Sequence, residues 1–95
     1  MRPTLDEIRS AIAVPMARRG VVRAGVFGSF ARGEATGSSD VDFLVEFEPG
    51  RTLLDLAGLR LDLCDALGRE VDVATQGSLH PGLRERILRE VVPVL

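Results

Sequence analysis

Three aspartates in this chain lie where carboxylates are costly, in segments that otherwise have the pattern of buried β-strands. Asp40 and Asp42 are two residues apart in "SSDVDFLVEF", and Asp72 lies between valines in "REVDVAT". Side chains two apart on a strand point to the same face, so Val41 and Phe43 take the opposite face. Like charges this close repel, and burial strengthens the repulsion. The sequence therefore predicts a compensating positive charge beside these aspartates.

A divalent cation is the simplest source of that charge. Carboxylate oxygens are ligands that Mg²⁺ prefers, and Mn²⁺ accepts the same ligands, so the choice of metal stays open. If the strand of Asp72 pairs in register beside that of Asp42, the three carboxylates can hold two ions about 3.5–4 Å apart, which suits in-line displacement at phosphorus. We therefore expect Asp40, Asp42 and Asp72 to be metal ligands and catalytic residues.

A group of residues suited to holding an anion precedes the aspartates. Gly28 lets a phosphate approach the backbone closely, and the N–H groups of a helix start together with the Ser29 hydroxyl can hold an anion. Arg32 follows within one helical turn and can place two N–H groups on phosphate oxygens. Ser39, in the "TGSS" loop, either contacts the nucleotide or only shapes the loop. Phosphate and metal sites joined by a loop fit ATP with Mg²⁺.

The apolar patterning predicts one domain, residues 1–95, of the α/β (α+β) class: a small mixed β-sheet with helices packed on it. Residues "TLDE" have the spacing of a capping box at the start of the first helix, which Gly20 ends. A short helical turn is expected over "FARGEA". The expected strands are Val21–Gly28, Val41–Phe47 and Glu70–Thr75, and the later helices are Thr52–Gly68 and Leu83–Val92.

Two features of the helices carry further expectations. Pro15 lies inside the first helix and is expected to kink or split it. Helix Thr52–Gly68 has more apolar residues than one stripe needs, so it is either buried on two sides or presents one side to a second subunit, the same chain or another.

Composition excludes several classes of protein. The net charge is −2 and the pI is about 5.3, which argues against an extended nucleic-acid surface. All twelve basic residues are Arg, so no mechanism can use a Lys. One cysteine, Cys64, and one histidine, His80, cannot make a Cys/His zinc site.

No apolar run is long enough to cross a bilayer, and no secretory signal is present at the N-terminus, so a cytoplasmic protein is expected.

Two alternative motifs fail on the residues themselves. An EF-hand beginning at Asp40 needs Gly at its sixth position, where Val45 stands. A P-loop reading of "GSFARGEA" lacks the Gly-Lys-Ser/Thr ending.

The spacing of Gly28-Ser29, ten residues, then Asp40-x-Asp42 resembles the signature of the DNA polymerase β nucleotidyltransferase superfamily. The stretch "FGSFARGEATGSSDVDFLV" is similar to its smallest members, the minimal nucleotidyltransferases, and "EVDV" lies where that family has its third carboxylate. The resemblance covers nearly the whole chain, from "RPTLDEIR" to "RERILREVVPVL".

The resemblance implies the polymerase β-like fold and transfer of AMP from ATP to an acceptor hydroxyl with release of pyrophosphate. It also implies pairing with a HEPN-domain toxin, in which the nucleotidyltransferase is the antitoxin and modifies a tyrosine of the toxin. Because the chain is short, acceptor specificity is expected to come largely from a protein partner.

Two rival interpretations remain open on the sequence. The chain could be a binding module that neutralises its partner by masking it, with catalysis secondary. It could instead transfer a nucleotide to a small molecule or an RNA end, although no pocket for a large acceptor is evident in the sequence.

Overall fold

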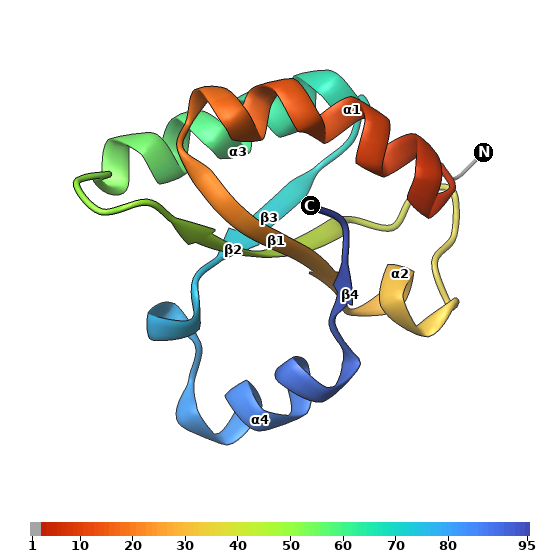
Figure 1. Cartoon of the computed structure of the whole chain (residues 1–95). Helices are drawn as coiled ribbons and strands as arrows, with labels where there is room; N and C mark the ends of the chain where they lie inside the picture. The colour runs from red at the N-terminus through yellow and green to blue at the C-terminus, as the bar shows by residue number, and fades with distance from the viewer. Residues whose placement is uncertain (1–2) are drawn as a thin grey trace.

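The computed structural model describes residues 3–95 and contains a four-stranded sheet with helices on both sides (Figure 1). Two long helices, α1 and α3, lie together across one face, and α4 lies on the other side. The elements are α1 Leu5–Arg18, β1 Val21–Phe27, α2 Ser29–Arg32, β2 Val41–Phe47, α3 Leu53–Leu67, β3 Val71–Ala74, a 3₁₀ turn Gln76–Ser78, α4 Pro81–Glu90 and β4 Val92–Pro93.

The sheet is mixed, with the strand order β3-β2-β1-β4. Strand β2 pairs antiparallel with β1 and parallel with β3, and β1 pairs antiparallel with β4. The expected small mixed sheet with packed helices is confirmed, and its central strand β2 has the bounds predicted from sequence.

Helix α1 begins with the predicted capping box. The Glu7 N–H donates to Thr4 Oγ1 at 3.1 Å, and the Thr4 N–H donates to Glu7 Oε1 at 3.1 Å. The helix then continues through Pro15 to Arg18, so the expected split at the proline is wrong. Pro15 lies in the last turn of the helix, where its missing N–H removes only one hydrogen bond near the end.

Helix α3 also begins and ends as predicted, between a capping box at Thr52 and the left-handed C-cap Gly68. Its burial is one-sided: Leu59 and Leu63 are fully buried, whereas Leu54 and Leu61 are 81% and 64% exposed. Burial of this helix on two sides within the chain is therefore wrong, and an apolar face remains exposed.

The C-terminal segment differs from the expected helix Leu83–Val92. Helix α4 begins two residues earlier, at Pro81, where His80 Nδ1 accepts a hydrogen bond from the Gly82 N–H at 3.0 Å. The chain leaves the helix after Glu90 and pairs as β4 with β1. Pro93 favours extended backbone in the residue before it, which disfavours a helix there.

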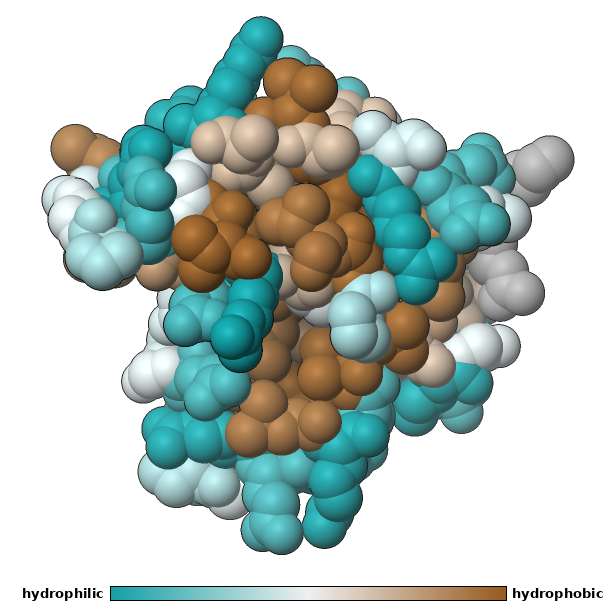
Figure 2. Space-filling view, in the orientation of Figure 1, coloured by the Kyte–Doolittle hydropathy of each residue, from teal (hydrophilic) through white to brown (hydrophobic). Residues whose placement is uncertain are grey.

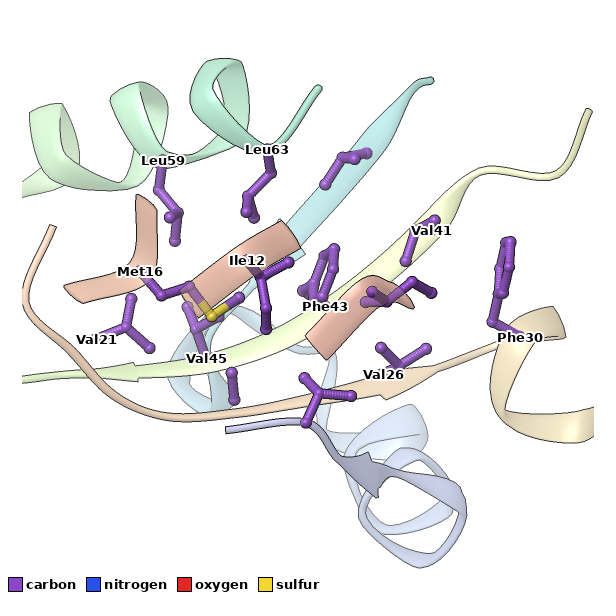
Figure 3. Close-up of a cluster of buried hydrophobic side chains, with 14 of the residues drawn as sticks. Ile12, Met16, Val21, Val26, Phe30, Val41, Phe43, Val45, Leu59 and Leu63 are labelled. Carbon is purple, nitrogen blue, oxygen red and sulfur yellow. The ribbon is translucent and has the colours of Figure 1, made fainter. Parts of the chain in front are cut away.

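The core lies between the sheet and the pair α1 and α3. Figure 3 shows Leu59 and Leu63 projecting from α3 toward the α1 residue Ile12, with Phe43 of β2 close by. Ile12, Phe43, Leu59 and Leu63 have no exposed surface. Because β2 side chains alternate between faces, the burial of Phe43 in this core directs its neighbour Asp42 to the opposite face.

The surface view shows apolar side chains gathered between α1 at the top and α4 at the bottom, with hydrophilic side chains around them (Figure 2). On the α4 side of the sheet, a partly open pocket of about 230 Å³ is lined by Gly25, Leu44, Leu88 and Val91 among others. In residues 3–95, no helix is both long and apolar enough to span a membrane.

Two leucines of α3 test this arrangement. Leu59→Ala is expected to lower the free energy of unfolding by about 2–5 kcal/mol, because it leaves a cavity in the core. Leu61→Ala makes the same chemical change on the exposed face and should cost less than about 1 kcal/mol. Urea denaturation of both variants measures the difference, and equal losses would contradict the orientation of α3.

Candidate active site

The parallel pairing of β2 and β3 brings the predicted carboxylates together. Asp42 lies directly beside Asp72 in the register, and Val41 beside Val71. The two valines are buried in the core, so the two aspartates occupy the other face of the sheet. Asp40 precedes the first residue of β2, is exposed, and is close enough for its charge to act on Asp42. The three aspartates are thus neighbours, as the sequence predicts.

Asp42 is the most perturbed of the three. Partial burial, and then the negative charges of Asp72 and Asp40, raise the pKa of Asp42 to about 6. A hydrogen bond with Asp72 raises the pKa further, while the positive charge of Arg32 opposes the change. The site therefore has an excess of negative charge that nearby protein groups compensate only in part.

The donor chemistry of the three aspartates fits a hard cation such as Mg²⁺, which binds carboxylate oxygens. The uncompensated charge on Asp42 is a second observation in favour of such an ion. In the part of the chain that the structure describes, no group of three His, Cys, Asp or Glu side chains is already arranged as a metal site. An ion held by Asp40, Asp42 and Asp72 would therefore require these side chains to rearrange around it.

Gly28 provides space for Asp42. It adopts φ 71° and ψ −148°, a conformation essentially restricted to glycine. A Cβ at this position would lie against the Asp42 carboxylate. The Gly28 N–H donates to Glu90 Oε1 at 3.0 Å. Gly28 thus separates β1 from α2 without displacing the carboxylate beside it.

Arg32 lies between the aspartates and two glutamates. Its Nη1 is 3.2 Å from Glu90 Oε1, and its Nε donates to Glu34. The hydrogen bond to Glu34, with the charges of both glutamates, raises the pKa of Arg32, so the guanidinium stays charged. Because α2 has only four residues, a helix dipole contributes little here, and the Arg32 and Ser29 side chains are the groups that an anion could contact. Ser29 is half-buried at the start of α2.

The loop before β2 is closed by Ser39. Its Oγ accepts a hydrogen bond from the Thr36 N–H at 2.8 Å, and its own N–H donates to the Thr36 carbonyl at 3.2 Å. The structure therefore gives Ser39 a role in shaping the loop that leads to Asp40. A contact between Ser39 and the nucleotide remains a prediction.

Two residues near the site have no signal in the sequence. Arg69 donates from Nη1 to the Ser39 carbonyl at 3.1 Å, and its guanidinium lies 5.7 Å from the centre of the Phe30 ring. Glu90 contacts Gly28 and Arg32 from the end of α4. Both join segments that are far apart in the chain, and neither belongs to a local motif. Only the tertiary structure shows that they support the loops on either side of the aspartates.

The apolar pocket between the sheet and α4 shares a sheet face with the aspartates. Leu44, which lines it, follows Asp42 by two residues on β2, about 7 Å along the strand. This pocket could not be predicted from the sequence, because its walls come from β1, β2, α4 and the C-terminal segment together.

The family model and the curated relatives that match this chain are all nucleotidyltransferases. The model of the nucleotidyltransferase domain matches residues 9–94. The Thermococcus cleftensis protein adenylyltransferase MntA is 44% identical over 95 residues, 96% of each chain. A Methanocaldococcus jannaschii protein assigned as a protein adenylyltransferase is 50% identical over 91 residues, 96% of this chain and 98% of its own length.

Solved structures show the same fold. One assigned to a minimal nucleotidyltransferase has a TM-score of 0.82 at 50% identity and covers 96% of both chains. A toxin–antitoxin structure with AMP-PNP has a TM-score of 0.77 at 19% identity, over 92% of this chain and 72% of that chain. A structure of the tri-AMPylated Shewanella oneidensis HEPN toxin with its MNT antitoxin has a TM-score of 0.72 at 16% identity, over 97% and 72%.

The charge of Asp42 makes stability depend on pH. Its pKa of about 6 in the folded protein lies above the value near 3.9 expected for the unfolded chain, so ionisation opposes folding as pH rises from about 4 to about 6. Asp42→Asn removes this penalty. After allowance for solvent screening, we expect the metal-free variant to be more stable than the wild type by about 1 kcal/mol above pH 6, with no gain below pH 4.

Urea denaturation in EDTA at pH 4 and pH 7.5 measures this gain. Glu46→Gln is the matched control, because Glu46 is on the same strand and face but exposed, and its effect should stay within about 0.5 kcal/mol. A loss of stability in Asp42→Asn at pH 7.5 would contradict the repulsion between the aspartates.

The cost of a side chain at Gly28 can be compared with its cost at a second glycine that has a positive φ. Gly33 also has a positive φ, 72°, but a Cβ there has no atom within 4 Å. Gly33→Ala should cost about 1 kcal/mol of stability from conformational strain alone. Gly28→Ala adds a clash with Asp42 to a backbone conformation that alanine tolerates less well than that of Gly33, so it should cost more, by about 2 kcal/mol or above. Equal losses, measured by thermal unfolding, would show that Gly28 does not make room for the carboxylate.

Proposed function

Because the chain belongs to the nucleotidyltransferase domain family and is an enzyme of that class, we propose that it is a protein adenylyltransferase that transfers AMP from ATP to a hydroxyl group of a partner protein. The observation that carries the proposal is the register of β2 and β3, which places Asp42 beside Asp72 with Asp40 and Arg32 within range of their charges. Relatives named as protein adenylyltransferases support the same acceptor class.

The partner that we propose is a HEPN-domain toxin, with this chain as its antitoxin and a tyrosine of the toxin as the acceptor. The fold shared with the MNT antitoxin of the Shewanella oneidensis complex supports this choice. The apolar pocket beside Leu44 is open to one side and lies about 7 Å along β2 from Asp42, so it can receive the ring of an acceptor tyrosine. The exposed leucines of α3 offer a surface for a protein partner, and we place the reaction in the cytoplasm.

In the proposed reaction, the acceptor oxygen attacks the α-phosphorus of ATP. A new bond forms between that oxygen and the phosphorus, and the bond from the α-phosphorus to the bridging oxygen of pyrophosphate breaks. The proton of the acceptor hydroxyl passes to the carboxylate of Asp72, which lies on the acceptor side. Arg32 and the Ser29 hydroxyl hold the triphosphate, and Gly28 leaves room for it.

Asp40 and Asp42, with Asp72 at the acceptor side, would hold two Mg²⁺ ions. When bound, such ions lower the pKa of an attacking hydroxyl and neutralise charge on the leaving oxygen. Their positive charge also offsets the repulsion that raises the pKa of Asp42. Mn²⁺ would suit the same carboxylates.

The principal alternative is an antitoxin that neutralises its partner by masking it. The presence of Asp42 beside two further aspartates argues against a purely structural domain, because replacement of Asp42 by a neutral residue is expected to stabilise the fold. Binding and catalysis are separable by experiment.

The test uses α-labelled ATP with Mg²⁺, the purified product of the gene next to the one that encodes this chain, and intact mass spectrometry. We expect the partner to gain AMP units, and Asp40→Asn to lower the rate on the order of 100-fold or more. Asp65→Asn, an exposed aspartate of α3, is the matched control and should keep the wild-type rate. A stable complex without any gain of mass would support masking and overturn the transferase proposal.

A further inference from the structure

Glu90, the last residue of α4, connects the C-terminal segment to the turn between β1 and α2. Its carboxylate oxygen Oε1 accepts the Gly28 N–H at 3.0 Å and lies 3.2 Å from Arg32 Nη1. These contacts join residues 62 and 58 positions apart in the chain. One carboxylate therefore contacts two of the residues that we assign to the phosphate site.

The position is an unfavourable one for a carboxylate that has no partner. The C-terminal end of a helix carries partial negative charge, which disfavours an acidic side chain there. The Glu90 side chain is also only 20% exposed, and a mostly buried charge is costly unless it is paired. By contrast, Glu85 on the same helix is 83% exposed and pairs weakly with Arg89 at 3.5 Å. The contacts with Gly28 and Arg32 therefore compensate the charge of Glu90 at this position.

The contact restrains Arg32 in particular. Arg32 is near enough to Asp42 for its charge to lower the pKa of that carboxyl, so the aspartates attract the guanidinium. Arg32 Nη1 and Nε are also engaged, by Glu90 and Glu34 respectively. An arginine has five N–H donors, so these two contacts leave others for an anion. Without the glutamates, Arg32 would be drawn onto the aspartates, where it would oppose cation binding and be removed from the phosphates.

The same carboxylate fixes the backbone before Ser29. Gly28 has the glycine-restricted values φ 71° and ψ −148°, and its N–H is held by Glu90. The direction in which the chain leaves Gly28 determines where the Ser29 hydroxyl lies. One side chain from the far end of the sequence therefore contacts both the Arg32 guanidinium and the backbone that leads to Ser29.

We propose that Glu90 is a positioning residue for the nucleotide: it orients Arg32 and the Gly28–Ser29 turn so that they meet the triphosphate of ATP. This inference rests on the proposed function, since it concerns the same site. The competing explanation is that Glu90 only ties the C-terminal segment to the sheet.

The experiment measures the ATP dissociation constant by isothermal titration calorimetry in Mg²⁺, with KM and kcat for AMP transfer. Glu90→Ala should raise the dissociation constant and KM about 10-fold or more, with kcat at saturating ATP changed by less than about 3-fold. Glu90→Gln keeps an oxygen for the Gly28 N–H but loses the charge, so its effect should be intermediate. Glu90→Gln also provides the answer should the alanine variant fail to fold.

A double-mutant cycle distinguishes positioning from a structural tie. If Glu90 acts through Arg32 and the Gly28–Ser29 turn, then adding Glu90→Ala to the combined variant Arg32→Ala/Ser29→Ala should change the ATP dissociation constant by less than about 2-fold. A full additional loss in that background would overturn the proposal. So would a lowered melting temperature in Glu90→Ala with unchanged ATP affinity.

Glu85→Ala is the matched control on α4 and should bind ATP like the wild type. If the wild type binds ATP and Glu90→Ala behaves like Glu85→Ala, the inference about Glu90 fails and the proposed function stands. If the wild type itself binds no ATP, the proposed function fails, and the inference that rests on it fails with it.

Discussion

The parallel pairing of β2 with β3 is the constraint on which the site depends. Burial of Val41, Phe43 and Val71 against α1 and α3 fixes which face of each strand is apolar. Because side chains alternate, Asp42 and Asp72 must then share the other face, side by side in the register. A shift of either strand by one residue would bury an aspartate and expose a valine. Packing of the core thus determines where the charges meet.

The clustering of the aspartates lowers the stability of the fold. Neighbouring negative charges and partial burial raise the pKa of Asp42 to about 6, and Arg32 offsets only part of the effect. Arg32 is itself engaged by Glu34 and Glu90, which prevents it from neutralising the aspartates completely. The charges therefore form an alternating series, aspartates, arginine and glutamates, in which negative charge remains in excess where a cation would bind. Sites of catalysis commonly retain such unfavourable charge.

Much of this organisation is encoded locally and could be predicted. The bounds of β2 follow from an apolar run between turn residues, and the ends of α3 follow from Thr52 and Gly68. The three aspartates could be identified because a carboxylate is unusual among strand residues. The family resemblance drawn from Gly28-Ser29 and Asp40-x-Asp42 agrees with the nucleotidyltransferase match over residues 9–94.

What could not be predicted depends on contacts between distant segments. The strand β4 is only two residues long, and it forms because β1 offers an unpaired edge. Helix α1 continues through Pro15 because that proline lies in the last turn of the helix. The rule that proline interrupts a helix does not distinguish this position from the middle of a helix. Glu90 and Arg69 hold the loops around the aspartates from other parts of the fold, and nothing in their immediate sequence distinguishes them from surface charges.

We propose that Asp42 and Asp72 act together in binding cations. The most direct measurement is titration of the nucleotide-free protein with Mn²⁺, followed by electron paramagnetic resonance of the free ion. We expect saturable binding to the wild type at pH 7.5 and affinity at least about 10-fold weaker in Asp72→Asn, since one charge and one ligand are lost. Equal affinity in the two proteins would contradict the claim and would leave the pairing of the aspartates without a function.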